Sequence, residues 1–266
     1  MPLVTLNSMS MYYREEGDGF PVVLMNGLGS DHRGWSQQIE ALRTRFRCIA
    51  FDNRDVGRSD RAQAPYNIAD MAGDARELLD KLGVAEAHFV GFSMGAAIAQ
   101  EFVLAHPERV RSLVLMNAYT SSDPRGAALF SGWKLLRRNL TLEEYYRATF
   151  PWVYTHQEYR IPGLIDRTVQ ALTQDPLAQE ADAFCRQVDA TLTFFSEDRL
   201  DRIAAPTLLI FGEDDLLTPL RFAKVLAERI PHAELHVIPG TGHGLLWTRA
   251  AEVNSMLVSF LEKHTP

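Results

Sequence analysis

The stretch HFVGFSMGAAIAQEF, residues 88–102, decides the class of fold. A short apolar run typical of a buried strand leads directly into a helical pattern, and Ser93 stands at the junction between Gly91 and Gly95. The spacing is G-x-S-x-G, which is informative when it falls between a strand and a helix. Side chains at either glycine would collide with the neighbouring strand and helix, because the chain reverses sharply. The pattern therefore predicts a strained turn that holds the Ser93 hydroxyl above the sheet, rather than a glycine-rich turn that merely starts a helix.

Outward from this junction, strand-like and helical runs alternate along the chain. Residues 4–14 have the alternating pattern of an opening hairpin, whereas the runs 21–27 and 46–52 are continuously apolar, as in strands buried on both faces. Further strand-like runs are 88–92, 110–118, 206–212 and 233–239, and helical patterns occupy 35–42, 71–82, the residues after Ser93, 219–230 and 248–264. The alternation predicts an α/β fold with a mostly parallel, eight-stranded, doubly wound sheet.

One long segment interrupts the alternation. Residues 119–205 contain no strand pattern, only helical stretches rich in aromatic side chains. Such a segment is too long for a plain loop, so we expect a helical cap inserted after the sixth strand and packed over the carboxyl edge of the sheet. Residues 1–118 and 206–266 would then form the core. Most of the aromatic side chains are expected to form the cap's own core, and a minority to line a pocket beneath it.

Composition narrows the classes of function. The chain has 266 residues, is 46% hydrophobic and carries a formal net charge of -7. No run of Lys or Arg could neutralise a row of phosphates, so nucleic acid is not an expected partner. Cys48 and Cys185 lie far apart and outside any CxxC motif, which favours a reducing compartment over a metal or disulfide framework. Because the chain shows neither a signal peptide nor a membrane-spanning run, a soluble cytoplasmic protein is predicted. The oligomeric state stays open.

A serine hydroxyl is a poor nucleophile near neutral pH, so Ser93 needs a base, and the base needs an acid to orient it. Both are expected at the ends of later strands. The stretch LLIFGEDDLLTP places Asp214 and Asp215 directly after one strand, and HVIPGTGHGLLW places His243 after the next. The resulting chain order is Ser, Asp, His.

With these motifs, almost the full length of the sequence resembles the α/β-hydrolase family. The resemblance implies that Ser93, Asp215 and His243 are the nucleophile, acid and base. In that family the acid usually stands three residues after the glycine that ends the strand and four before a proline, which favours Asp215 over Asp214. The alternative acid position after the sixth strand holds Asn117, which cannot carry a negative charge.

The resemblance also implies where the oxyanion of the tetrahedral intermediate is held. One backbone donor is the amide of Met94, directly after the nucleophile, and the other is the amide of Leu28 in the loop NGLGSD. Relatives commonly have His-Gly at the start of this loop, so Asn26 is a departure that puts the support of the loop in question. The hole itself needs only the backbone.

The stretch FDNRDVGRSD also resembles the family, whose members carry D-x-R-x-x-G-x-S after this strand. The matching residues are expected to tie down loops rather than to take part in the reaction. They are Asp52, Arg54, Gly57 and Ser59. His32 and Arg58 are candidate contacts at the rim of the pocket.

The implied activity is hydrolysis of a small or medium ester or lactone through an acyl-enzyme, with no cofactor and no metal. Ser93 in place of an aspartate argues against epoxide and haloalkane hydrolases, and Phe92 fits carbon–carbon bond hydrolases poorly. The sequence is most similar to serine esterases, bromoperoxidase-type perhydrolases, 3-oxoadipate enol-lactonases and the aminoacrylate-hydrolase group. Perhydrolase activity and a hydrolase-like ligand receptor with slow or no turnover therefore remain alternatives. A non-catalytic scaffold is disfavoured because all three triad positions are filled.

Overall fold

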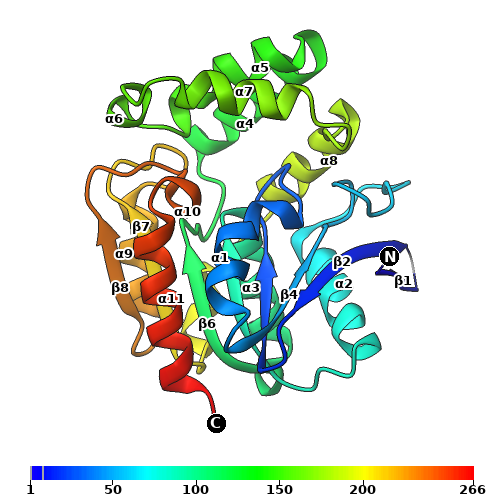
Figure 1. The fold of residues 1–266 in the computed structure, drawn as a ribbon, viewed down its shortest axis with the longest axis vertical. Coiled ribbons are helices and arrows are strands. Elements are labelled where there is room, and N and C mark those ends of the chain that lie inside the picture. Colours follow the sequence, from blue (N-terminus) through cyan, green and yellow to red (C-terminus); the bar gives the residue numbers. More distant parts are fainter. Residues whose placement is uncertain (1, 8) are drawn as a thin grey trace.

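The computed structural model describes residues 2–7 and 9–266. These residues form an eight-stranded sheet in the order β1-β2-β4-β3-β5-β6-β7-β8, in which only the pairs β1/β2 and β2/β4 are antiparallel. The strands are Leu3–Thr5 (β1), Ser10–Glu16 (β2), Phe20–Met25 (β3), Phe46–Phe51 (β4), Ala87–Phe92 (β5), Val110–Met116 (β6), Thr207–Gly212 (β7) and Glu234–Ile238 (β8). The predicted mostly parallel α/β sheet is confirmed (Figure 1).

Helices cover both faces of the sheet because the central strands are apolar on both sides. One face packs against Ile68–Lys81 (α2), Met94–Ala105 (α3) and Leu220–Arg229 (α9). The other face packs against Ser36–Leu42 (α1), Leu245–Thr248 (α10) and Ala250–His264 (α11). Four short 3₁₀ helices among the described residues are His32–Trp35, Pro107–Arg109, Phe150–Trp152 and Glu197–Arg202.

Several boundaries differ from the expectations. The opening hairpin consists of β1 and β2, which pair from Leu3 with Tyr12 to Thr5 with Ser10, and residue 8 lies outside the described residues. The helix expected over 248–264 is α11, which begins at Ala250, and the separate short helix α10 ends at Thr248, with Arg249 between the two at a φ of -124°. The helix expected over 71–82 begins three residues earlier, because Asn67 caps its first turn.

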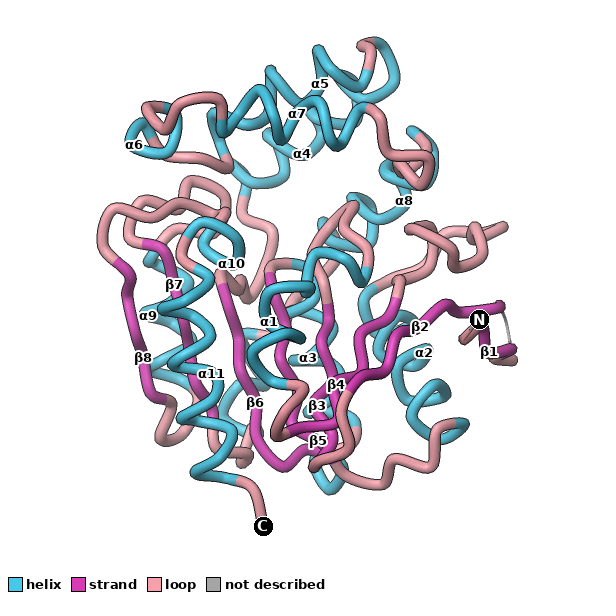
Figure 2. Tube along the Cα trace, viewed as in Figure 1, coloured by secondary structure: helices cyan, strands magenta, loops and turns pink. Residues whose placement is uncertain are grey.

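The segment between β6 and β7, which we call the cap (residues 119–205), is helical throughout its regular structure. It contains Pro124–Asn139 (α4), Leu142–Thr149 (α5), His156–Tyr159 (α6), Leu164–Thr173 (α7) and Ala181–Leu192 (α8). Figures 1 and 2 show these helices above the carboxyl ends of the parallel strands. Its two ends meet in an antiparallel bridge between Ser121 and Phe195. Two small clusters of buried aromatic and aliphatic side chains hold the cap helices together.

Within the described residues, none of the helices combines the length and the apolar character that crossing a bilayer requires.

Candidate active site

Ser93 lies at the tight turn between β5 and α3, with a φ of 55° and a ψ of -120°. The flanking glycines are required by close backbone packing. A Cβ on Gly91 would lie 2.6 Å from Cα of Ala96 at the start of α3, and a Cβ on Gly95 would lie 2.0 Å from the carbonyl oxygen of Met25 at the end of β3. The turn can therefore form only with glycine at both positions, and it leaves Ser93 partly accessible while Phe92 and Met94 are buried.

Three side chains from three loops meet in one hydrogen-bonded chain. Nε2 of His243 lies 2.9 Å from Oγ of Ser93, and Nδ1 of His243 lies 2.7 Å from Oδ2 of Asp215. His243 and Asp215 are buried, and Ser93 is half-buried at the floor of a cavity. The structure thus brings together the nucleophile, base and acid candidates of the sequence, in the order that proton transfer from serine to histidine requires.

Asp215 is set up as an ionised acceptor. Its carboxylate accepts hydrogen bonds from the backbone amides of Leu217 and Thr218 at 2.8 and 3.0 Å, and from the Thr218 hydroxyl at 2.7 Å. Burial alone would raise the pKa of Asp215, but the charge and hydrogen bond of His243 and the Thr218 donors outweigh it and lower that pKa below its usual value. Asp214, the competing candidate, is exposed.

Two further residues hold the loop of His243, and sequence reasoning did not find either role. The Asn117 amide donates to the carbonyls of Gly242 and His243 at 3.4 and 3.1 Å and accepts from the backbone of Gly212 at 2.9 Å. From the cap, the carbonyl of Val153 accepts from the backbone amide of His243 at 2.9 Å. Asn117 therefore occupies the alternative acid position as a structural clamp.

The loop after β3 carries the predicted oxyanion donor Leu28. Asn26, where relatives commonly have histidine, is fully buried and supports the loop through its side chain. Its oxygen accepts from the backbone amide of Gly27 at 2.8 Å, and its nitrogen donates to the carbonyl of Asp31 at 2.8 Å. A Cβ on Gly27 would lie 3.1 Å from Cβ of Ser93, so the loop passes directly beside the candidate nucleophile. The departure from histidine leaves the loop well supported.

The cap also binds this loop, through two buried glutamines. Oε1 of Gln187 accepts a hydrogen bond from the backbone amide of Gly29 at 3.0 Å, and Nε2 of Gln187 donates to the carbonyl of Arg54 at 3.0 Å. Nε2 of Gln179 donates to Oε1 of Gln187 at 3.0 Å and to the carbonyl of Asp55 at 3.1 Å. Each of these contacts joins residues more than a hundred positions apart or lies within the cap, so no local sequence pattern could indicate them.

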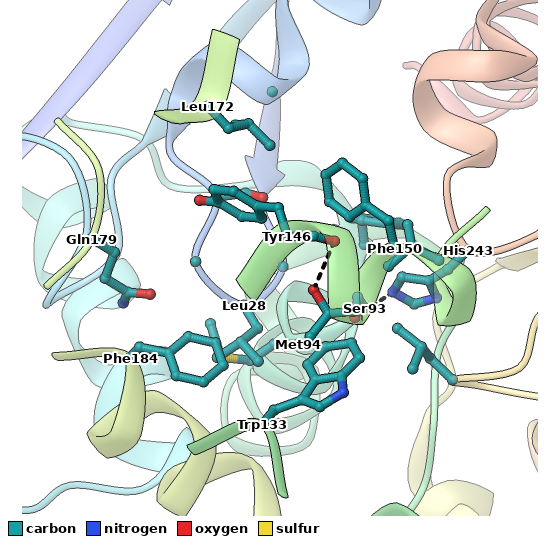
Figure 3. Close-up of a pocket in the computed structure, with 18 of the residues that line it drawn as sticks. Leu28, Ser93, Met94, Trp133, Tyr146, Phe150, Leu172, Gln179, Phe184 and His243 are labelled. Carbon is teal, nitrogen blue, oxygen red and sulfur yellow. Dashed lines mark hydrogen bonds between the residues drawn. The ribbon is translucent and has the colours of Figure 1, made fainter. Parts of the chain in front are cut away.

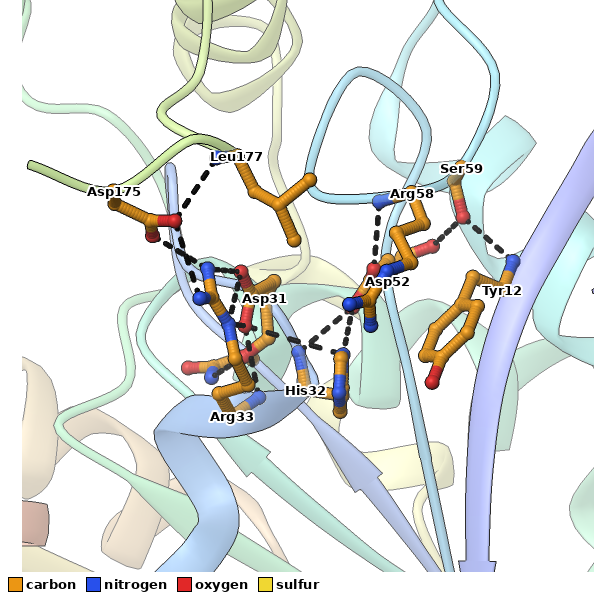
Figure 4. A network of polar contacts seen from close by, with 10 residues as sticks. Tyr12, Asp31, His32, Arg33, Asp52, Arg58, Ser59, Asp175 and Leu177 are labelled. Carbon is orange, nitrogen blue, oxygen red and sulfur yellow. Dashed lines mark hydrogen bonds and ion pairs between the residues drawn. The ribbon is translucent and has the colours of Figure 1, made fainter. Parts of the chain in front are cut away.

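Figure 4 shows the polar network beside the loop. Asp52 lies at its centre: its carboxylate accepts from the His32 backbone and ring at 2.8 and 2.6 Å and from the Arg58 backbone at 2.9 Å, and its carbonyl accepts from Ser59 at 2.6 Å. Asp52 and Ser59 thus have contacts of the loop-tying kind that was expected. Gly57 adopts a φ of 56° beside them.

The two candidate rim residues do not lie at the rim. His32 is 3% exposed and its ring is held by Asp52, while Arg58 is exposed with its guanidinium 4.9 Å from the centre of the Tyr12 ring. Neither is among the described residues that line the cavity. Arg54, the remaining member of the motif, binds Asp74 through two hydrogen bonds of 2.7 Å.

Above Ser93 and His243 lies a cavity of about 1020 Å³ between the core and the cap. Much of its lining is aromatic and aliphatic, and Figure 3 shows Leu28, Trp133, Tyr146 and Phe150 around the Ser93–His243 pair. The apolar and aromatic lining residues include Leu28, Phe130, Trp133, Tyr145, Tyr146, Phe150, Leu172, Phe184 and Leu217. Most of the aromatic residues of the cap line the pocket, so the expectation that only a minority would do so is wrong. The cavity lies against the cap's own aromatic clusters, and only a few aromatic residues, such as Phe194, are buried elsewhere.

Comparisons with known proteins agree with this architecture. Residues 21–250 match the family described as alpha/beta hydrolase fold. A protein of Azorhizobium caulinodans named "Putative carbamate hydrolase RutD" is 32% identical over 98% of this chain and 98% of its own length. Among solved structures, the α/β hydrolase MGS-M2 from a deep-sea metagenome library has a TM-score of 0.93 at 25% identity, over 99% of this chain and 98% of that one. Est816, described as an N-acyl homoserine lactone degrading enzyme, has a TM-score of 0.82 at 28% identity, over 97% of this chain and 100% of that one.

Proposed function

The chain belongs to the α/β-hydrolase family, and from this premise we propose that it is a serine hydrolase that cleaves a small to medium carboxylic ester or lactone through an acyl-enzyme. A fold alone does not determine an activity. The observation that carries the proposal is the unbroken hydrogen-bonded chain from Asp215 through His243 to Ser93, which opens into a cavity.

In the first half of the reaction, Nε2 of His243 takes the proton of Ser93 as Oγ bonds to the carbonyl carbon. The bond between that carbon and the leaving oxygen then breaks, and His243 gives its proton to the leaving group. In the second half, water loses a proton to His243 and attacks the acyl-serine, and the proton returns to Oγ of Ser93. One water is consumed, and a carboxylic acid and an alcohol are released. Asp215 stabilises the histidine cation in both halves.

Negative charge develops on the carbonyl oxygen in both halves. We assign its two donors to the backbone amides of Leu28 and Met94, one in the loop beside Ser93 and one in the first turn of α3. The amides at a helix N-terminus lack intrahelical partners, so that of Met94 is available to a ligand. Loss of one such donor typically raises the barrier by about 3 to 4 kcal/mol.

The cavity supports a substrate with a substantial apolar portion. A volume of about 1020 Å³ is far more than a small polar carbamate fills, and burial of apolar substrate atoms against the aromatic lining is favourable. A carbamate ester presents the same kind of carbonyl to Ser93, so the name carried by the RutD relative makes carbamates a second class to include.

The test is turnover of p-nitrophenyl butyrate and of simple lactones and carbamate esters by the purified protein and by Ser93→Ala. We expect the wild type to release p-nitrophenol and the variant to lose that activity. Peroxyacid formation from acetate and hydrogen peroxide in the same preparations measures the perhydrolase alternative. If wild type and variant are equally inert on every ester and lactone, the hydrolase proposal is wrong and the receptor alternative gains support.

A further inference from the structure

One basic side chain lines the cavity without a carboxylate beside it. Arg137 belongs to α4 of the cap and is half-buried. Its guanidinium lies 5.7 Å from the centre of the Tyr145 ring and donates a hydrogen bond to the backbone carbonyl of Gln179. Within residues 2–7 and 9–266, no Asp or Glu forms an ion pair with it.

The other charged residues that line the cavity, apart from His243, have ion-pair partners. Arg33 lies between Asp31 and Asp175 and binds both carboxylates. Asp123 forms an ion pair with Arg221. Arg137 is therefore the one cation in the described lining that is not already neutralised by a carboxylate. A half-buried guanidinium loses hydration without gaining a counter-ion, which favours binding of an anion from solution.

Arg137 also lies away from the reacting groups. It binds the backbone of Gln179, and Figure 3 shows Gln179 across the cavity from His243, with Tyr146 and Leu28 between them. The part of the cavity between Gln179, beside Arg137, and His243 is lined mainly by apolar side chains. A ligand that reaches both ends must therefore combine a carbonyl group, an apolar middle and a group suited to a guanidinium.

We propose that Arg137 binds a carboxylate at the remote end of the substrate. This inference rests on the proposed function and narrows its substrate class to esters or lactones whose acyl portion ends in a carboxylate. A guanidinium has five N–H donors in a planar fork, and the Gln179 carbonyl accepts from one of its terminal nitrogens. The remaining donors suit the two oxygens of a carboxylate, in hydrogen bonds that are stronger than neutral ones because both partners are charged.

The experiment compares p-nitrophenyl monoesters of adipic, suberic and sebacic acids with p-nitrophenyl esters of methyl-ended acids of matched length. These diacids are long enough to avoid self-cleavage through a small cyclic anhydride. For at least one length we expect the wild type to prefer the carboxylate ester about tenfold in kcat/KM, the selectivity that one charge-assisted contact provides. In Arg137→Met that ratio should fall to about one, and it should fall toward one in the wild type as salt is added.

Arg138→Met is the matched control, because Arg138 is the next residue of α4, is exposed, pairs with Asp182 and does not line the cavity. It should keep the preference of the wild type. The inference is overturned if the wild type cleaves the methyl-ended esters equally well at every length, or if Arg137→Met retains the selectivity, and the hydrolase proposal survives either result.

A binding measurement keeps the two proposals separate if no ester is cleaved. Monomethyl adipate is titrated calorimetrically into Ser93→Ala and into Ser93→Ala combined with Arg137→Met. Binding to the first protein that is lost or weakened about tenfold in the second supports the anion site even without turnover. Equal binding to both proteins, or binding to neither, overturns it.

Discussion

Oε1 of Gln187, in the cap, accepts a hydrogen bond at 3.0 Å from the backbone amide of Gly29, one residue beyond the assigned oxyanion donor Leu28. The same Gln187 side chain donates to the carbonyl of Arg54 in the neighbouring loop and is fully buried. The loop beside Ser93 is therefore completed by a residue of the cap. We infer that Gln187 is a positioning residue that acts through the backbone of the loop.

Replacing Gln187 with methionine keeps the size of the side chain but removes the acceptor. Because the Leu28 amide then loses its fixed orientation, we expect kcat to fall about tenfold or more while KM changes less than about twofold. The affinity of a trifluoromethyl ketone, whose adduct carries the oxyanion, should fall in parallel. Steady-state kinetics and inhibition constants measure both.

Ser196→Ala is the control for this prediction, because Ser196 forms another fully buried hydrogen bond between cap and core, to Gln100 at 2.8 Å, away from the loop. If Ser196→Ala lowers kcat as much as Gln187→Met does, attachment of the cap as a whole explains the effect. A change confined to KM in Gln187→Met would also contradict the positioning role.

The identity of the acid is tested by two adjacent substitutions. Asp215→Asn removes the charge that stabilises the histidine cation and favours the wrong tautomer, so kcat should fall by about 10⁴-fold, as for other Ser-His-Asp enzymes. Asp214→Asn changes an exposed side chain and should stay within about twofold of the wild type. Measurement of kcat for both variants tests the assignment. A larger loss of kcat in Asp214→Asn than in Asp215→Asn would identify Asp214 as the acid.

The packing of the turn at Ser93 is tested by adding one methyl group. In Gly95→Ala the new Cβ would lie 2.0 Å from a backbone oxygen, so β3 and α3 must separate and the free energy of unfolding should fall by several kcal/mol. Gly73→Ala is the control, because a Cβ there, within α2, meets nothing within 4 Å. That substitution should stabilise the protein by about 0.5 to 1 kcal/mol. Urea denaturation measures the free energy of unfolding of both variants. Equal stability of Gly95→Ala and Gly73→Ala would refute the close contact at Gly95.

His88 makes the stability depend on pH. His88 lies on β5, and its ring is buried. The ring forms hydrogen bonds with Ser112 at 2.7 Å and with Thr265 at 3.1 Å. Burial and the nearby charge of Arg111 lower the pKa of His88 to about 4. The unfolded chain therefore binds a proton near pH 6.5 that the folded chain does not take up until near pH 4. The contribution of His88 to stability is full above pH 6.5 and is lost progressively as the pH falls to 4.

Denaturation at pH 7 and pH 4.5 should show this loss, on the order of 2 to 3 kcal/mol, on top of the effect of the acidic residues. His88→Gln has no titrating ring and should lose less stability than the wild type between the two pH values. His156→Gln, which removes an exposed histidine, should behave as the wild type does. An identical pH dependence in all three proteins would rule out the assigned role of His88.

The sheet and the turn at Ser93 could be predicted because their determinants are local. Continuous apolar runs specify buried strands, and Gly91 and Gly95 are needed at fixed distances from Ser93. The order of Ser93, Asp215 and His243 along the chain could also be predicted from the sequence. The structure places His243 within hydrogen-bond distance of both Asp215 and Ser93.

The supports of the site could not be predicted, because they join distant parts of the chain or use the backbone. Gln187 and Gly29 are separated by 158 positions, and nothing in the sequence around a polar residue of a cap helix identifies such a partner. The carbonyl of Val153 holds the amide of His243, and a backbone carbonyl has no sequence signature at all. The burial of His32 follows from its bond to Asp52, another contact between separate loops.

Covalent labelling with an alkyl p-nitrophenyl phosphonate, followed by peptide mass spectrometry, identifies the nucleophile directly. We expect one adduct per chain, on the peptide that contains Ser93, formed in step with the loss of esterase activity. We also expect His243→Ala to be labelled far more slowly, because the base is gone. An adduct on any other residue, or equal labelling of Ser93→Ala, would show that Ser93 is not the nucleophile.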